Sequence, residues 1–219
     1  MIVLTGASGG IGEGIYLTLN NIEPTIGLYN THKPSYLGTT KQLDLSSLPA
    51  IKEFILQLKP TKVTVIHLAA VKIDELTVAC NEGNWDKVMD VNLKGDFLLT
   101  KALLQIMLKE KWGRIIHIIS SGLGDVGTLT YSTSKFGLLG MSEVLSKEYA
   151  KFGITSNVLQ LGYFQTGLWN KLSQEKKLEL LDQIPSKKLG DVQNIVNAVK
   201  FIIDSPYVNG AVINIDGGI

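Results

Sequence analysis

Cysteine is almost absent from this chain of 219 residues, in which Cys80 is the only one. A single cysteine cannot form an intrachain disulfide, which indicates a reducing compartment, so we expect a cytoplasmic protein. Cys80 lacks neighbours that would support a nucleophile, and we interpret it as a packed or partly exposed thiol. The three histidines, at positions 32, 67 and 117, show no paired spacing typical of metal ligands, so we expect no metal site.

Long runs of one charge and long apolar runs are missing as well. The formal net charge is +1 and no long basic or acidic block occurs, so nucleic acid or an anionic membrane has no electrostatic support as a partner. No apolar run approaches the ~20 residues that a membrane-spanning helix needs. The start, MIVLTGASGG, has no positively charged segment and is broken by glycines, so it predicts a first strand rather than a signal peptide.

Residues 114–135 combine a buried strand with polar residues that follow it. Ile115 to Ile119 form an apolar run with one interruption, which is typical of a parallel strand buried on both faces. Ser120 and Ser121 come next, then a glycine-rich loop, and a helix is predicted from about Tyr131. Because open α/β sheets bind ligands at the carboxyl ends of their strands, the two serines are candidates for a binding site.

Tyr131 and Lys135 are four positions apart and share one face of that helix. A free tyrosine has a pKa of about 10, too high for acid–base chemistry near neutrality. A neighbouring ammonium favours the phenolate, so we expect Lys135 to lower the pKa of Tyr131 and make it a proton donor to a forming alkoxide. Ser120 or Ser121 could hold the same oxygen by a hydrogen bond. The pair alone is weak support, because residues 29–33 repeat its spacing at a strand end.

The amino-terminal segment predicts a nucleotide-binding turn. A short strand over Ile2–Leu4 runs directly into Thr-Gly-Ala-Ser-Gly-Gly-Ile-Gly at residues 5–12, and a helix follows. Glycines let the backbone turn sharply and let a pyrophosphate approach the helix N-terminus, where free N–H groups favour an anion. The spacing of Gly6, Gly10 and Gly12 differs from the usual G-x-G-x-x-G. An ordinary glycine-rich turn is the alternative, but the position at the first strand–helix junction favours cofactor binding.

The loop after the second predicted strand, Thr25–Tyr29, bears on the choice of cofactor. A carboxylate there would bind the ribose hydroxyls of NAD, whereas basic residues suit the extra phosphate of NADP. Asn30 and Thr31 are followed by His32 and Lys33, and no carboxylate is present. We therefore expect NADP rather than NAD. Solvated loop residues are the alternative, and the first loop carries no positive charge.

Two further predicted strands supply candidate contacts to the cofactor, and a structural role is the alternative for each. The segment Lys41–Leu45 predicts a short strand, and Asp44 could cap a helix or touch an adenine. Val63–Leu68 predicts a buried strand that ends at Ala69 and Ala70. Small residues there would let a flat cofactor lie close to the backbone, and tight helix packing explains them equally well.

A long helix is predicted over Trp85–Leu108, and Asn92 lies within it. A mid-helix asparagine either faces solvent or bends the helix by competing for backbone hydrogen bonds. From the residues alone, the solvent-facing position is favoured.

Strands and helices alternate up to a last strand over Ala211–Ile215. The pattern predicts an α/β fold with one doubly wound parallel sheet of the Rossmann type, helices on both faces, and a single domain over residues 1–219. Residues 163–190 break the alternation, with apolar positions among Lys and Gln. They follow a strand's carboxyl end and predict a substrate lid, or else an amphipathic pair of surface helices.

These motifs together resemble the short-chain dehydrogenase/reductase family over essentially the whole chain. The family's first-loop pattern Thr-Gly-x3-Gly-x-Gly is matched by residues 5–12, and its helix asparagine by Asn92. Its Ser, Tyr and Lys are matched by Ser120, Tyr131 and Lys135. Three segments look most like 3-oxoacyl-carrier-protein reductases, although sugar, steroid and alcohol dehydrogenases share them; these are residues 85–95, 112–116 and 188–191.

Departures from the family pattern affect several expected contacts. Residues 67–70, His-Leu-Ala-Ala, replace Asn-Asn-Ala-Gly, so an asparagine that braces the central strands is missing. Ser120 and Tyr131 are 11 positions apart, which is shorter than is common in the family. Strand register favours Ser120 over Ser121 as the catalytic serine, and both stay open. Leu161-Gly162 replaces Pro-Gly, while Thr166 keeps the place of a residue that binds the nicotinamide amide.

The resemblance implies an NAD(P)-dependent oxidoreductase that interconverts a carbonyl and an alcohol by hydride transfer. It implies Tyr131 as the acid/base, Lys135 as the residue that lowers its pKa and holds the nicotinamide ribose, and Ser120 as the contact to the substrate oxygen. Asn92 would bend its helix and hold a proton-relay water. The residues expected to bind NADP or NAD are Gly6, Ser8, Gly10, Ile11, Gly12, Asn30, Thr31, His32, Asp44, Leu45, Ala69, Ala70, Tyr131, Lys135, Gly162 and Thr166.

The sequence also bears on other functions and on the partners. A catalytically silent dinucleotide-binding sensor or scaffold is the alternative, motivated by residues 67–70 and the shortened serine loop. Epimerase chemistry on sugar nucleotides is disfavoured, because the chain lacks room for a large substrate domain. The expected partner is a small carbonyl or alcohol with hydrophobic surface, with no nucleic acid and no membrane. The resemblance also implies a homo-oligomer, a tetramer or dimer, with the late helix and last strand in an interface.

Overall fold

The computed structural model describes residues 1–59, 62–166, 169 and 172–219. Within these ranges, parallel strands form one sheet in the order β3-β2-β1-β4-β5-β6-β7. The strand order changes direction between β1 and β4, which is the predicted doubly wound arrangement. The strands are β1 (Ile2–Thr5), β2 (Thr25–Tyr29), β3 (Thr40–Gln42), β4 (Val63–His67), β5 (Gly113–Ser120), β6 (Ile154–Leu161) and β7 (Val212–Ile215).

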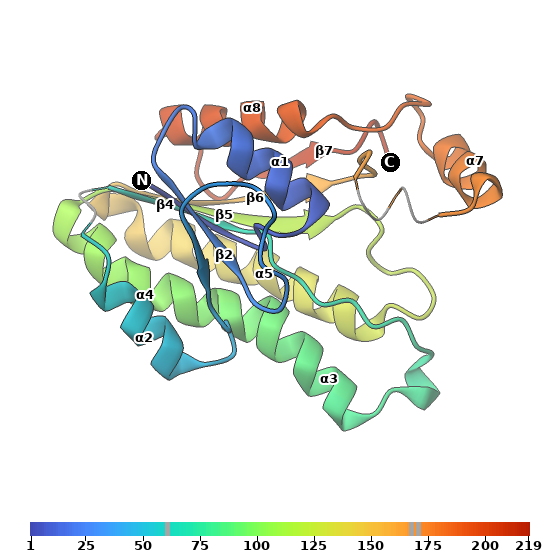
Figure 1. Ribbon diagram of the computed structural model, residues 1–219, viewed down its shortest axis with the longest axis horizontal. Coiled ribbons are helices and arrows are strands. Elements are labelled where there is room, and N and C mark those ends of the chain that lie inside the picture. Colours follow the sequence, from blue (N-terminus) through green and yellow to red (C-terminus); the bar gives the residue numbers. More distant parts are fainter. Residues whose placement is uncertain (60–61, 167–168, 170–171) are drawn as a thin grey trace.

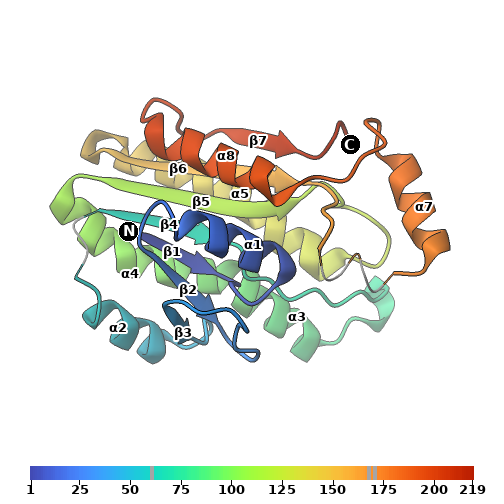
Figure 2. The same ribbon diagram turned by 45° about the horizontal axis from the view of Figure 1, so that its top comes forward.

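Helices cover both faces of the sheet, as predicted (Figure 1). One face carries α1 (Gly10–Leu19) and α8 (Val192–Asp204), and Figure 2 shows this pair in front of the sheet. The other face carries α2 (Leu48–Leu56), α4 (Gly95–Glu110) and α5 (Leu129–Tyr149). The shorter elements are η1 (Thr77–Ala79), α3 (Glu82–Met89), η2 (Asp90–Lys94), η3 (Ala150–Phe152) and α7 (Gln174–Gln183).

The core forms two apolar layers, one on each side of the sheet, because side chains alternate along each buried strand. In β1, Ile2 and Leu4 pack with α1 and α8, whereas Val3 packs with α2 and α4. In β5, Ile116 packs in the layer of α1 and α8, and Ile115 packs in the layer of α2 and α4. This alternation explains why the central strands read as continuous apolar runs in the sequence.

Most predicted elements are present, with shifts of a few residues at their ends. The strand predicted over Lys41–Leu45 is shorter and lies at Thr40–Gln42. The long helix predicted over Trp85–Leu108 extends from Glu82 to Glu110 and contains a π-helical turn, η2, in its middle. Across the ranges that the structure describes, no helix is long and apolar enough to cross a membrane.

Candidate active site

A cavity of about 930 Å³ runs across the carboxyl ends of the central strands. It extends from the loop between β1 and α1 to the first turns of α5. Among the predicted site residues, His32 and Asn92 do not line it. Those that do are Gly6, Ser8, Gly10, Ile11, Gly12, Asn30, Thr31, Asp44, Leu45, Ala69, Ala70, Ser120, Tyr131, Lys135, Gly162 and Thr166.

The loop between β1 and α1 folds so tightly that two positions require glycine. Gly6 has a φ of +71°, and a Cβ built on it would lie 2.8 Å from Ala69 N. A Cβ on Gly12 would lie 2.1 Å from Gly6 O. Gly9 precedes α1 and offers no side-chain cap, so the first N–H groups of α1 are left without a capping partner beside the cavity. Such a helix start favours an anion, which suits a pyrophosphate.

Thr5 joins β1 to the segment that follows β4. Its Oγ1 accepts hydrogen bonds from Leu68 N at 3.0 Å and from Ala69 N at 2.9 Å. This hydroxyl therefore braces the two central strands although the expected asparagine is missing. Ala69 packs against Gly6 while both line the cavity, so the two interpretations of the small residues at 69 and 70 are compatible.

Asp44 closes a turn at the far end of the cavity. Its Oδ1 accepts from the backbone N and the Oγ of Ser46, at 2.9 and 2.7 Å. The residue that caps α2 is Ser47, whose side chain accepts from Ala50 N. Of the two roles predicted for Asp44, the helix cap is wrong, and the contact with an adenine stays a prediction.

Asn30 and Thr31 follow β2 and line the same end of the cavity. His32 is exposed, with its Nδ1 3.0 Å from Thr31 Oγ1, and lies outside the lining. The predicted contact between His32 and the cofactor stays a prediction.

Ser120 is the last residue of β5 and lines the cavity. Its Oγ accepts a hydrogen bond from Gly122 N at 3.3 Å. Ser121 does not line the cavity, and its backbone N donates to Leu161 O on β6 at 2.9 Å. Ser120, rather than Ser121, therefore lines the same cavity as Tyr131.

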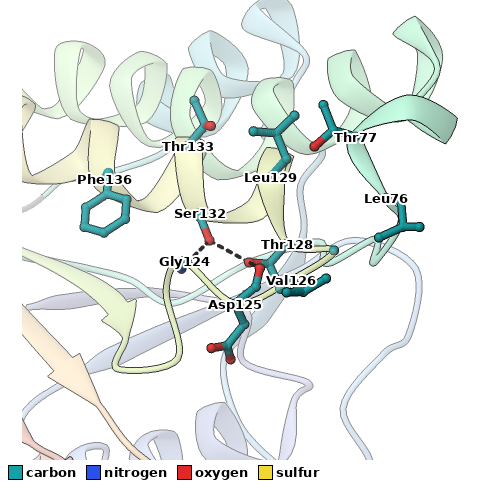
Figure 3. Close-up of a pocket in the computed structure, with 11 residues that line it drawn as sticks. Leu76, Thr77, Gly124, Asp125, Val126, Thr128, Leu129, Ser132, Thr133 and Phe136 are labelled. Atoms are coloured by element: carbon teal, nitrogen blue, oxygen red, sulfur yellow. Dashed lines mark hydrogen bonds between the residues drawn. The ribbon is translucent and has the colours of Figure 1, made fainter.

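The loop between β5 and α5 is short but anchored on the first turn of α5 (Figure 3). Gly124 N donates to Ser132 Oγ at 2.9 Å, and Thr128 Oγ1 lies 2.8 Å from the same atom. A second cavity, of about 540 Å³, lies beside this loop and has apolar walls that include Leu76 and Phe136. It shares no lining residue with the first cavity. The anchored loop fixes the start of the helix that carries Tyr131.

Tyr131 and Lys135 both line the first cavity, and Lys135 is almost completely buried. Burial raises the pKa of Tyr131, and the Asp74 carboxylate raises it further. The predicted decrease is therefore wrong for this conformation. The reason is that burial, followed by the Asp74 carboxylate, sets the direction of the Tyr131 pKa. Lys135 Nζ donates to Ile118 O at 2.9 Å on β5.

Asn92 is fully buried, so the solvent-facing position favoured from the residues alone is wrong. It lies in the π-helical turn η2, as the family resemblance implied for a helix distorted at this residue. Its Nδ2 donates to Val71 O at 2.8 Å and to Ser134 Oγ at 3.1 Å, and its Oδ1 accepts from Val71 N at 2.7 Å. Asn92 thus links the segment after β4 to the helix that carries Lys135, without lining the cavity itself.

Among the described residues of the segment 163–190, the one that lines the cavity is Thr166. Gly162 lines it as well, and a Cβ on Gly162 would lie 2.7 Å from Asp216 Cα. The helix α7 stands at the carboxyl end of the sheet (Figure 1) and has no buried residue. Residues 167–168 and 170–171 of the predicted lid lie outside the described residues. The lid stays a prediction.

Two charged residues beside Tyr131 were missed by the sequence reasoning. Lys72 Nζ lies 5.8 Å from the centre of the Tyr131 ring and 3.1 Å from Asp74 Oδ2. They lie in the segment after β4, and this position near a strand end was the available signal. The lining residues that the sequence reasoning missed lie in the first loop, in or just after strands, or on α3 and η2: Thr5, Gly9, Leu28, Tyr29, Leu43, Leu68, Val71, Lys87, Val91, Ile118, Ile119 and Leu161.

The sequence profile described as short chain dehydrogenase matches residues 1–177 of this chain. The chain belongs to the short-chain dehydrogenase family. As a member of this family it is an NAD(P)-dependent oxidoreductase that interconverts a carbonyl and an alcohol.

Relatives within the family align over almost their full length. A 3-oxoacyl-(acyl-carrier-protein) reductase of Buchnera aphidicola subsp. Baizongia pistaciae is 32% identical over 99% of this chain and 95% of its own. Proteins of the same description from Rickettsia bellii and Escherichia coli K12 are 32% and 31% identical, with the same coverage.

The cavity suits the family's dinucleotide cofactor. The uncapped start of α1 offers N–H donors for the phosphates, and the tight Gly6–Gly12 turn keeps side chains out of that position. Ala69 and Ala70 leave room along the end of β4, and Tyr131 and Lys135 lie at the other end of the same cavity. When bound, the nicotinamide supplies or accepts the hydride.

Proposed function

We propose that this enzyme reduces the 3-oxo group of an acyl thioester to a 3-hydroxy group and prefers NADPH. The observation that carries the proposal is that Ser120, Tyr131 and Lys135 line the same cavity as the uncapped start of α1. The relatives described as 3-oxoacyl-(acyl-carrier-protein) reductases support the substrate class. His32 and Lys33, without a carboxylate after β2, support NADPH.

Each polar residue has a separate part in the proposed reaction. Ser120 Oγ holds the substrate carbonyl oxygen by a hydrogen bond, and Tyr131 donates the proton that this oxygen gains as it becomes a hydroxyl. Lys135 holds the cofactor ribose, and its positive charge stabilises the phenolate that remains. Asn92 keeps Val71 and Ser134 in place on either side of this group.

The test uses the purified protein with NADPH or NADH and acetoacetyl-coenzyme A, followed by cofactor fluorescence. We expect turnover with NADPH, and a fall of about 10²- to 10⁴-fold in kcat for Tyr131→Phe with cofactor affinity nearly unchanged. Tyr207→Phe, at a fully exposed tyrosine, serves as the control and should retain full activity.

Two results would contradict the proposal in different ways. Undiminished turnover in Tyr131→Phe would remove Tyr131 from the chemistry. Turnover of simple ketones but not of acetoacetyl thioesters would be consistent with the proposed roles of the residues, but it would reject acyl thioesters as the substrate class. The alternative of a catalytically silent binder is not favoured, since the residues of the reaction lie together in one cavity.

A further inference from the structure

A second group of ionisable side chains lies buried outside the lining of the cavity. His67 ends β4, His117 lies within β5, and the parallel register pairs them directly. Their rings stack with centroids 5.0 Å apart and an interplanar angle of 7°. Asp96 on α4 faces both, with Oδ1 3.2 Å from His67 Nδ1 and Oδ2 3.6 Å from His117 Nδ1. All three side chains are fully buried.

The strand register and the π-helical turn place this group. Side chains alternate along β5, so His117 lies on the face that α4 and α5 cover. His67 is paired with His117 in the neighbouring strand β4 and lies on the same face. The turn η2 ends immediately before α4, so Asn92 and Asp96 both point into the protein and are completely buried. Asn92 forms hydrogen bonds with Val71 in the segment after β4, whereas Asp96 lies against the two histidines.

A metal ion does not account for the group. In the part of the chain that the structure describes, no group of three or more His, Cys, Asp or Glu side chains is arranged to hold one. The charge of Asp96 must therefore be compensated by the protein, because a buried carboxylate without a positive partner is costly.

The basic side chain nearest to the carboxylate is His67, whose Nδ1 lies 3.2 Å from Asp96 Oδ1, and a buried candidate for a further positive partner is Lys135. Its Nζ donates to Ile118 O at 2.9 Å, on the residue next to His117 in β5. Burial lowers the pKa of Lys135, and the Asp96 carboxylate opposes that decrease. Burial also lowers the pKa of His117, which makes this ring a poor source of positive charge. Asp96 and Lys135 are thus two buried opposite charges that reach adjacent residues of β5, His117 and Ile118, from helices on the same face of the sheet.

We propose that Asp96 is a positioning residue for catalysis that acts through Lys135, because its buried negative charge keeps Lys135 an ammonium beside Tyr131. His67 and His117 hold the carboxylate in place. The proposal rests on the roles proposed above for Tyr131 and Lys135, and it does not depend on the identity of the substrate.

Removal of this charge shifts the pH range of activity in a known direction. Tyr131 and Lys135 titrate as a coupled pair. Whichever of the two releases the first proton, the pair becomes less positive, and the Asp96 carboxylate opposes that change. Asp96→Asn should therefore move the basic limb of the kcat/KM profile to lower pH by about one unit or more.

The other charged groups around the pair stay in place in this variant. Lys72 and Asp74 face Tyr131 from the segment after β4. His67 and His117 face Asp96 from β4 and β5. A shift of the basic limb in Asp96→Asn therefore reports the loss of the Asp96 charge.

Thr100→Val is the matched control. Thr100 Oγ1 lies 2.8 Å from His67 Nε2, so this variant removes a polar contact from the same buried group at constant charge and similar volume. We expect it to lower stability without moving the basic limb. A limb that stays in place in Asp96→Asn, or that moves equally in Thr100→Val, overturns the proposal.

A spectroscopic measurement tests Lys135 without turnover. The protein is labelled with ¹³C at lysine, and the NMR signal of Lys135 is assigned by its loss in Lys135→Arg. The chemical shift of this signal during a pH titration reports whether Lys135 is an ammonium or a neutral amine. We expect an ammonium at pH 7 in the wild type and earlier deprotonation in Asp96→Asn. A neutral amine at pH 7 overturns the proposal even if Asp96→Asn does not fold. Because no substrate is added, failure of the 3-oxoacyl assignment leaves this result interpretable.

Discussion

The side chain of Asn92 binds both backbone groups of Val71: its Oδ1 accepts from Val71 N at 2.7 Å, and its Nδ2 donates to Val71 O at 2.8 Å. Val71 lines the cavity, and Asn92 lies in the π-helical turn between α3 and α4. A helix distorted at this turn therefore fixes one wall of the active site. The distortion has a structural function in addition to any part in proton transfer.

Asn92→Ala should destabilise the protein by about 1–3 kcal/mol, because it removes the side chain that pairs with both backbone groups of Val71. Denaturant unfolding measures this change. Asn197→Ala, at an exposed asparagine on α8, is the control and should change stability by less than about 0.5 kcal/mol. Equal effects of the two variants would show that the Val71 contacts contribute nothing.

Ser120→Ala should lower kcat by about 10²-fold, since a hydroxyl that stabilises the substrate oxygen in the transition state is lost. Ser121→Ala should leave kcat nearly unchanged, because Ser121 does not line the cavity. The two variants remove the same group from adjacent positions, so steady-state kinetics on both decides which serine acts. A larger loss in Ser121→Ala would assign the role to that residue.

The first loop separates a packing requirement from a binding requirement. Gly12→Ala should destabilise the fold by about 2 kcal/mol or more, because the new Cβ would meet Gly6 O at 2.1 Å. Gly9→Ala should fold normally, since its Cβ would meet only Gly6 O at 3.5 Å. We expect weaker cofactor binding in Gly9→Ala, measured by fluorescence titration, because Gly9 lines the cavity beside the start of α1. Unchanged binding would place the pyrophosphate elsewhere.

Features written in a continuous stretch of sequence could be predicted, and they account for most of the fold and the cavity. The apolar runs of the central strands, the glycines at 6 and 12, and the spacing of Tyr131 and Lys135 are of this kind. Each follows from a local rule: strand burial, turn geometry or helical periodicity. The structure places these residues around one cavity.

Features that depend on a partner far along the chain could not be predicted. The environment of Asn92 is set by Val71, and the pKa of Tyr131 by burial and Asp74. The group of Asp96 and two histidines requires the register of β4 with β5 and the exact start of α4. No short sequence motif contains that information.

Replacement of both His32 and Lys33 by Ala should weaken NADPH binding by about threefold to tenfold and leave NADH binding unchanged. The reason is that exposed charge contacts to the extra phosphate contribute up to about 1 kcal/mol each. Lys200→Ala removes a charge from exposed α8, outside the cavity lining, and is the control. Fluorescence titrations at two salt concentrations measure both affinities. Equal losses for NADPH and NADH would reject phosphate recognition by this loop.

Each of the last two elements of the fold exposes a large apolar side chain. Phe201 on α8 is 52% exposed and Val212 on β7 is 51% exposed. The strand β7 also forms an edge of the sheet, with β6 as its one neighbour in the strand order. Exposed apolar side chains next to an unpaired strand edge are typical of a subunit interface. They agree with the homo-oligomer that the family resemblance implies.

We therefore predict that light scattering finds a tetramer or dimer, and that Phe201→Lys shifts it to a smaller species. A lysine at the centre of an apolar interface would have to lose its hydration without gaining a partner. Leu56→Lys, at a leucine on α2 that is 84% exposed, introduces the same charge on another surface and should leave the oligomer intact. A monomeric wild-type protein, or an oligomer that survives Phe201→Lys, would show that α8 and β7 do not form this interface.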